Sequence, residues 1–133
     1  MRNAECNEAM AVMDQPRDIH DRALEYGVRA IKLCRFLQKS RDFAAITIGK
    51  QYLRSATSIG ANMEEASAAE TRADFIHNCS IAQKEARECL YWLQLMTCAE
   101  IVRAKRIQEL LGETKELVAV ITTIARNARK RTE

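Results

Sequence analysis

Two residue patterns in this chain could support catalytic or metal chemistry, and the first is an acid–histidine pair. Asp74 and His77 stand three residues apart, the spacing at which di-iron helical bundles place a carboxylate and an imidazole. Such sites need a second pair on a facing helix, and His20, the other histidine, has no acid at the required offset. We therefore predict no metal site, and Asp74 has a sufficient role as an acidic residue at a helix start.

The second pattern is the set of cysteines. The chain has an odd number of them and no CxxC pair, namely Cys6, Cys34, Cys79, Cys89 and Cys98. A disulfide framework or a zinc site is therefore not expected, and the thiols are predicted to act as small apolar groups in a reducing compartment. No glycine-bracketed serine, phosphate-binding loop or Cys–His signature is present, so we predict neither an enzyme nor a bound cofactor.

Basic residues form two clusters that could bind an anionic partner. The formal net charge is only +3, but residues 101–133 carry eight Lys/Arg against four Asp/Glu, and residues 61–100 carry three against seven. A solvated surface, complementarity between subunits and contact with a nucleic-acid backbone remain alternatives, and the helix dipole alone could favour cations near a C-terminus. The first cluster covers about a third of a helix circumference and consists of Arg29, Lys32, Arg35 and Lys39. The second lies near the end of the chain and consists of Arg126, Arg129 and Lys130. Only 5% of residues are aromatic, which predicts few stacking platforms and weak sequence selectivity.

The segments that must position these residues are predicted to be helices. Four stretches repeat apolar or small residues at alternating steps of three and four, which places each row on one side of a helix. The first two rows are Ile19, Ala23, Tyr26, Ala30, Leu33 and Leu37, and Ile46, Gly49, Leu53, Ala56, Gly60 and Met63. The last two are Phe75, Cys79, Ala82, Ala86, Cys89, Leu93 and Met96, and Ile107, Leu110, Thr114, Leu117, Ile121, Ile124 and Ala128.

Capping residues and short links divide the chain into helices near 16–39, 43–66, 72–98 and 104–130. We expect Asp14 to cap the first helix and Thr71 the third. Short links force neighbouring helices to run antiparallel, so the predicted fold is all-α, an up-down-up-down four-helix bundle. It forms one domain over residues 16–130, with a flexible lead-in at 1–15 and a basic tail end at 131–133. The start lacks an apolar signal core and no long apolar run follows, which predicts a cytoplasmic protein without a membrane partner.

The helices carry more apolar surface than one seam requires. Leu24, Val28 and Ile31 lie away from the first stripe, and a second line on the next helix passes through residues 48, 52 and 59. A second set lies off the third stripe, namely Tyr91, Trp92 and Leu95. A helix that is apolar beyond one stripe packs against more than one neighbour. Self-association through these residues is the favoured interpretation, with a broad core within one chain as the alternative.

One region resembles a known family. The residues that carry the resemblance run from Leu53 to Ala66 (LRSATSIGANMEEA), through Asp74-Phe75-Ile76, to Ile81–Leu93 (IAQKEARECLYWL). This region is similar to the small bacterial four-helix-bundle family that includes proteins encoded within intervening sequences of large-subunit ribosomal RNA. The family also includes the accessory variability proteins of diversity-generating retroelements. The resemblance covers about residues 20–125 and implies a ring-like homopentamer, with RNA, DNA, a reverse transcriptase or another protein as partner. It does not imply an enzyme.

Ser58, Asn62 and Glu65 are spaced by four and three and share one helix face. If Ile46–Met63 is the inward stripe, these polar groups point outward or into a subunit contact. If the line through residues 48, 52 and 59 is inward instead, they are partly buried and need hydrogen-bond partners. We favour a structural polar motif over a ligand site.

These observations together predict a non-enzymatic homo-oligomeric bundle that binds nucleic acid with little sequence selectivity. The alternative is a protein–protein interaction scaffold without a nucleic-acid role.

Overall fold

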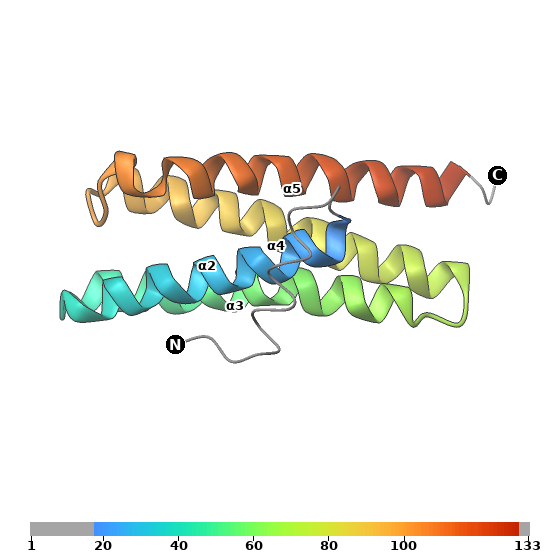
Figure 1. Cartoon of the computed structure of the whole chain (residues 1–133), viewed down its shortest axis with the longest axis horizontal. Coiled ribbons are helices and arrows are strands. Elements are labelled where there is room, and N and C mark those ends of the chain that lie inside the picture. Colours follow the sequence, from blue (N-terminus) through green and yellow to red (C-terminus); the bar gives the residue numbers. More distant parts are fainter. Residues whose placement is uncertain (1–17, 131–133) are drawn as a thin grey trace.

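The described part of the chain, residues 18–130 of this computed structural model, consists of four helices (Figure 1). They are α2 (Ile19–Lys39), α3 (Phe43–Ser67), α4 (Arg72–Cys98) and α5 (Ala104–Lys130). Each helix runs opposite to its neighbour in sequence, so the ends of α2 and α4 lie with the starts of α3 and α5 at one end of the bundle. The predicted all-α four-helix bundle is confirmed. The proposed lead-in at 1–15 and the tail end at 131–133 lie outside the described residues.

Side-chain caps explain where three of the helices begin. Asp42 Oδ1 accepts a hydrogen bond from the Ala44 N–H at 3.0 Å, and Thr71 Oγ1 accepts one from the Asp74 N–H at 3.1 Å. These bonds satisfy donors that have no partner within the helix. The cap of α2 is Asp18, whose Oδ1 accepts from the Asp21 N–H at 3.0 Å. The prediction that the first helix begins near Pro16 is therefore wrong, because a later aspartate supplies the cap.

The helices form a ring in which each packs on two neighbours. The contact of α3 with α4 is the most extensive, and that of α2 with α5 is the smallest. The contact of α2 with α5 includes ion pairs of Arg22 with Glu113 and Glu116 and the buried contact between the Tyr26 and Thr114 hydroxyls.

The predicted apolar rows of α2, α4 and α5 lie in the core, except that Ile19 and Phe75, which begin their rows, and Ile124 are only half-buried. On α5, Ala125 is buried where Ile124 was expected. The predicted row of α3 is confirmed at Gly49, Ala56 and Met63 but is wrong at its other three positions, because the helix is rotated so that Tyr52 and Ile59 face inward. The residues it buries are Ala45, Gly49, Tyr52, Ser55, Ala56, Ile59, Met63 and Ala66, whereas Ile46, Leu53 and Gly60 are half-buried.

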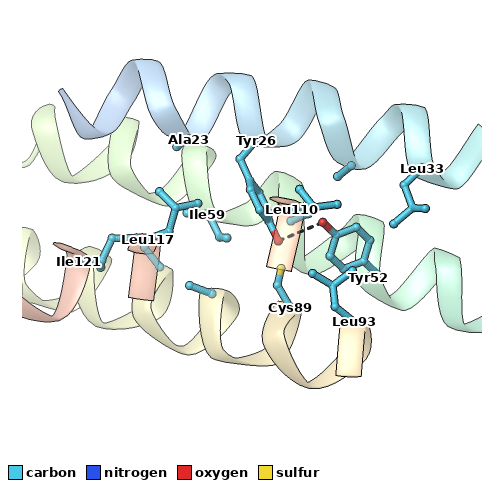
Figure 2. Packing of buried hydrophobic residues seen from close by; sticks show 14 of the residues in the cluster. Ala23, Tyr26, Leu33, Tyr52, Ile59, Cys89, Leu93, Leu110, Leu117 and Ile121 are labelled. Carbon is cyan, nitrogen blue, oxygen red and sulfur yellow. Dashed lines mark hydrogen bonds between the residues drawn. The ribbon is translucent and has the colours of Figure 1, made fainter. Parts of the chain in front are cut away.

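A chain of buried hydroxyls explains this rotation. Figure 2 shows Tyr26 and Tyr52 pointing toward one another in the core. The Tyr52 hydroxyl donates to the Tyr26 hydroxyl at 3.0 Å, and the Tyr26 and Thr114 hydroxyl oxygens are 2.6 Å apart. Thr114 in turn donates to the Leu110 carbonyl at 2.7 Å. Each of these three hydroxyls thereby has a hydrogen-bond partner, and α3 is rotated so that the Tyr52 hydroxyl reaches that of Tyr26 on α2.

The described cysteines are free thiols. Cys79 and Cys89 are fully buried, and burial raises the pKa of Cys89 to about 12. Cys34 is half-buried, its Sγ–H donates to the Gly49 carbonyl, and burial raises its pKa to about 11. These three fit the predicted role of small apolar groups, while Cys98 is exposed and Cys6 lies outside the described residues.

Candidate nucleic-acid interface

A cleft with basic walls separates the end of α2 from the start of α5. Its volume is about 240 Å³, and its floor consists of the core residues Leu33, Ile107 and Leu110. Its rim consists of Arg29, Lys32 and Phe36 from α2 and Arg106 and Glu109 from α5. These rim residues come together because α2 ends and α5 begins at the same end of the bundle (Figure 1). We call this hollow the α2–α5 cleft.

A second hollow of about 380 Å³ adjoins this cleft at the α4–α5 connection. Phe36 and Arg106 line both hollows, and the second adds Arg103, Glu100 and the apolar side chains of residues 101 and 102. The Phe36–Arg106 pair therefore stands between them, with Arg29 and Lys32 on one side and Arg103 on the other.

Phe36 and Arg106 form a cation–π pair. The guanidinium carbon of Arg106 lies 3.7 Å from the centre of the Phe36 ring. At this distance the flat guanidinium packs on the aromatic face. The Phe36 side chain is 39% exposed and Arg106 is exposed, so the pair is open to solvent.

Among residues 18–130, Arg22 and Arg54 pair with glutamates, whereas the cations of the cleft have no acidic partner. Within residues 18–130, Arg29, Lys32, Arg103 and Arg106 have no carboxylate oxygen within 4.0 Å. Glu109 and Glu100 line the hollows and reduce the positive potential without forming ion pairs.

Arg22 shows what a paired cation in this fold looks like. Its Nη2 lies 2.8 Å from Glu113 and 3.3 Å from Glu116, which joins α2 to α5 beyond the cleft. Burial alone would lower the pKa of Arg22, but hydrogen bonds and charge attraction from the two glutamates outweigh it and raise the pKa. Arg22 is therefore committed to structure, whereas the cations of the cleft are available to a ligand.

The structure divides the first predicted basic cluster. Arg29 and Lys32 line the α2–α5 cleft, whereas Arg35 lines a groove on the other side of α2, together with Lys50 of α3. Lys39 is exposed at the end of α2 and lines neither hollow. Sequence reasoning missed Arg103, Arg106 and Phe36. Arg103 and Arg106 are three residues apart, and Arg106 stands directly before the buried Ile107. This spacing was the signal in the sequence that could have identified Arg106 as a residue beside the core.

The second predicted cluster lies at the other end of α5. Arg126, Arg129 and Lys130 are exposed there, and Arg129 donates to the Ser80 hydroxyl at 2.7 Å. About 20 residues of helix separate this cluster from Arg106, roughly 30 Å at 1.5 Å per residue. The two basic clusters therefore do not form one site within a single chain.

The polar motif of Ser58, Asn62 and Glu65 lies on a helix whose inward line passes through Tyr52 and Ile59, so partial burial is the arrangement that applies. Tyr52 and Ile59 face inward, and Ser58 and Asn62 are half-buried. The Asn62 side-chain amide donates to the Ser58 hydroxyl at 2.9 Å and to the Ser58 carbonyl at 2.8 Å. Glu65 is exposed and does not join them. The Ser58–Asn62 pair thus satisfies itself within α3.

An apolar groove runs between α2 and α3, on the side of α2 away from the cleft. Its volume is about 460 Å³, and Gly27 and Gly60 keep it open. Three residues predicted to lie at a subunit contact line it, namely Leu24, Val28 and Ile31. Leu24 is 51% exposed and Ile31 is 37% exposed, so one chain leaves much of their apolar surface uncovered. We call this the α2–α3 groove.

The other residues predicted at a subunit contact lie on α4. Tyr91 is 56% exposed and its ring meets that of Trp92 edge to face, with the centroids 5.2 Å apart. Trp92 and Leu95 are half-buried, so each keeps some apolar surface exposed. The Trp92 indole N–H donates to Glu88, which also pairs with Arg54. Partial burial would raise the pKa of Glu88, but these two hydrogen bonds outweigh it and lower the pKa.

His20 joins the start of α2 to the end of α3. Its Nδ1 lies 3.2 Å from Glu64, and its Nε2 lies 2.9 Å from the Ser67 hydroxyl. This order of groups matches a hydrolytic triad, but the backbone N–H of Ala68, beside the serine, already bonds to carbonyls of α3. That N–H is therefore not free to stabilise an oxyanion. The contacts of His20 with Glu64 and Ser67 instead join α2 to α3.

The residues of the acid–histidine pair lie on the surface of α4. Asp74 and His77 are both exposed, and the Asp74 backbone N–H belongs to the helix cap. Among the described residues, no group of three or more histidine, cysteine, aspartate or glutamate side chains could hold a metal ion.

Comparison with known proteins places the chain in a family. Among residues 18–130, no helix has the length and apolar character that a membrane span requires. No curated protein sequence matches the chain. A similar solved structure is that of a protein of unknown function from the S23 ribosomal protein family of Bacteroides thetaiotaomicron. It is 38% identical, the match covers 81% of this chain and 98% of that one, and the TM-score is 0.76. Residues 16–123 match the 23S rRNA-intervening sequence protein family, and the chain therefore belongs to that family.

Proposed function

We propose that this protein is a non-enzymatic homo-oligomer that binds nucleic acid through its α2–α5 cleft, with little sequence selectivity. The observation that carries the proposal is the group of unpaired cations around the cleft, Arg29, Lys32, Arg103 and Arg106. Unpaired Lys and Arg side chains bind phosphates and release the counterions condensed on the nucleic acid. Phosphate contacts carry no sequence information, which accounts for the low selectivity.

The names of the similar proteins support an RNA partner. The matched family is named for 23S rRNA intervening sequences, and the similar solved structure for a ribosomal protein family. Both names refer to ribosomal RNA or the ribosome, where a protein with an unpaired basic cleft would meet phosphates.

Self-association would strengthen such binding. One cleft offers few phosphate contacts, but an assembly repeats it in every subunit. Several weak contacts on one polyanion raise the apparent affinity because later contacts become intramolecular. A pentamer, the assembly that the family resemblance implies, would carry five copies of the cleft and of the cluster at the end of α5.

The decisive experiment is binding of labelled single- and double-stranded RNA and DNA across a series of salt concentrations. We expect the logarithm of the binding constant to fall linearly with the logarithm of salt concentration. The Arg29→Glu/Lys32→Glu variant should bind more weakly, whereas Lys115→Glu, an exposed residue of α5 outside the cleft, should bind nearly as the wild type does. Absence of binding at low salt, or binding indifferent to salt, would overturn the proposal.

The oligomer is tested separately. Sedimentation velocity should show an assembly for the wild type and smaller species for Trp92→Ala and Leu95→Asp if the α4 face is a subunit contact. The corresponding variant of the α2–α3 groove is Leu24→Asp. Unchanged assembly in all three variants would mean that neither surface joins subunits, and a lone wild-type subunit would overturn the oligomer.

A second candidate function is a protein-interaction scaffold, which the exposed Tyr91 ring beside Trp92 favours. Aromatic side chains with one exposed face are enriched at protein interfaces. Its partner would be a reverse transcriptase or another protein. A stoichiometric partner that stays bound after nuclease treatment, and is lost in Tyr91→Ala, would support the scaffold over nucleic-acid binding.

A further inference from the structure

We propose that the Phe36–Arg106 pair is a stacking platform for one unpaired base, so that the α2–α5 cleft selects single-stranded over double-stranded nucleic acid. This inference rests on the function proposed above and assigns the class of nucleic acid that the cleft takes.

The first support is the geometry of the pair. The Arg106 guanidinium lies over the Phe36 ring, with its central carbon 3.7 Å from the ring centre. The ring thus backs one face of the guanidinium, while Arg106 is exposed to solvent. Proteins that bind single strands stack bases on aromatic rings and on guanidinium planes. An incoming base can extend this two-layer stack by lying on the open face of the guanidinium.

The second support is where the other cations stand. The pair separates two hollows, with Arg29 and Lys32 lining one and Arg103 lining the other. A nucleotide within a strand carries a phosphate on each side of its base. A base stacked on Phe36 and Arg106 would therefore have unpaired cations available for the phosphates on both sides.

The preference for single strands follows from what a duplex exposes. In a double helix both faces of every base are covered by its neighbours, so only phosphates, sugars and base edges are presented. A duplex can use the cations of the cleft but not the stacking pair. A single strand can use both, and every base has a face that can stack, which leaves sequence selectivity low.

The two acids near the pair limit its strength. Glu109 lines the cleft and Glu100 lines the adjoining hollow, and both repel phosphates. With this opposing charge, stacking becomes a larger share of the affinity than it would be on a purely basic surface. Removing the aromatic ring should consequently have a measurable effect even though the charge stays the same.

The test uses full-length protein and a short fluorescein-labelled oligouridine, compared with an RNA duplex of equal length by fluorescence anisotropy. The variant is Phe36→Leu, which keeps an apolar side chain but removes the ring. The matched control is Phe43→Leu, because Phe43 is 83% exposed at the start of α3 and does not line the cleft.

We expect Phe36→Leu to weaken oligouridine binding about tenfold, the size typical of one stacked base. Duplex binding should change little, and the salt dependence should keep its slope because no charge is removed. Phe43→Leu should bind as the wild type does. Arg106→Lys provides a second variant at an exposed position; it keeps the charge but removes the plane, and should also lose the preference for single strands.

The outcomes separate this inference from the function on which it rests. If the wild type binds neither probe at low salt, the proposed function fails, and this inference fails with it. If the wild type binds but Phe36→Leu and Arg106→Lys retain its preference, the proposed function stands and the stacking platform is wrong. An equal loss in Phe43→Leu would also overturn it, because the effect would then not belong to the cleft. Circular dichroism of each variant checks that the helices remain folded.

Discussion

Helix α2 has a groove on each of its sides, and the two differ in almost every property. The α2–α3 groove is lined by Leu24, Val28 and Ile31 and kept open by two glycines. The α2–α5 cleft is lined by Arg29, Lys32 and, from α5, Arg106. Residues 31 and 32 are adjacent in sequence, yet they face these different surfaces.

The difference indicates what each surface can accept. An apolar groove gains free energy when a partner removes it from water, and a second copy of the chain offers apolar surface of its own. A cleft of unpaired cations gains little from an apolar partner and much from a polyanion. The same helix is therefore suited to join subunits on one side and to bind nucleic acid on the other.

The largest expected effect comes from reversing charge in the cleft. Arg29→Glu/Lys32→Glu should weaken binding of oligouridine about a hundredfold and reduce the salt slope by about 1.4, because two phosphate contacts on a single strand are lost and two repulsions are added. Anisotropy titrations at several salt concentrations measure both quantities.

The matched control for this variant is Arg35→Glu/Lys50→Glu. It makes the same change in net charge, but both residues line a separate hollow between α2 and α3, which is neither the α2–α5 cleft nor the α2–α3 groove. We expect a loss of only a few-fold, from the weaker overall field. Equal losses in the two variants would show that total charge, and not the α2–α5 cleft, determines binding.

The next effect is on assembly. Ile31→Asp places a carboxylate in the α2–α3 groove, where a subunit contact would have to take it out of water. We expect the dissociation constant of the assembly to rise at least about tenfold. A loss of about 1.4 kcal/mol in the free energy of association, caused by burying the carboxylate, is enough for that change. Sedimentation velocity over a range of concentrations provides the measurement.

Lys32→Glu serves as the control, since it places an acid at the next residue but on the other side of α2. Its assembly should match that of the wild type. If Ile31→Asp also leaves the assembly intact, the α2–α3 groove is not a subunit contact and the α4 face around Tyr91 becomes the remaining candidate.

The contrast between the two sides of α2 could be predicted from sequence only in part. The bounds of α3, α4 and α5 were predicted almost to the residue, because Asp42 and Thr71 are local caps and the links are short. Local signals of this kind act within a few residues and are readable from one stretch of chain. The apolar residues of the α2–α3 groove were also identified, since Leu24, Val28 and Ile31 lie off the core stripe.

The inward face of α3 and the α2–α5 cleft depend on contacts between distant segments. On α3, the row through Leu53 and the row through Tyr52 fit helical spacing equally well. The choice is made by the hydroxyl of Tyr26 on another helix. The cleft combines Phe36 with Arg106, which only the order of helices in the bundle brings together. Neither pairing leaves a pattern within one segment of sequence.

A smaller effect is expected from the hydroxyl chain that crosses the core between these two sides. Tyr26→Phe removes the acceptor of the Tyr52 hydroxyl and the partner of Thr114. A buried hydroxyl left without a partner costs about 1–3 kcal/mol, so we expect the free energy of unfolding to fall by about 1–2 kcal/mol in urea titrations. Tyr91→Phe, at an exposed hydroxyl, should change it by less than about 0.5 kcal/mol. Equal stability of the two variants would contradict a structural role for the hydroxyl chain.

The smallest change distinguishes an occupied α2–α3 groove from an empty one. A Cβ added at Gly27 meets no atom within 4 Å in a single chain, and the same holds for Gly112 on α5, outside the groove. Both lie within helices, so each Gly→Ala variant should gain about 0.5–1 kcal/mol in free energy of unfolding of the lone subunit. In the assembly the two should differ, because a methyl group at Gly27 fills space that another subunit would occupy. Gly27→Ala should therefore weaken association several-fold while Gly112→Ala leaves it unchanged, and equal association in both would mean that the groove stays open to water.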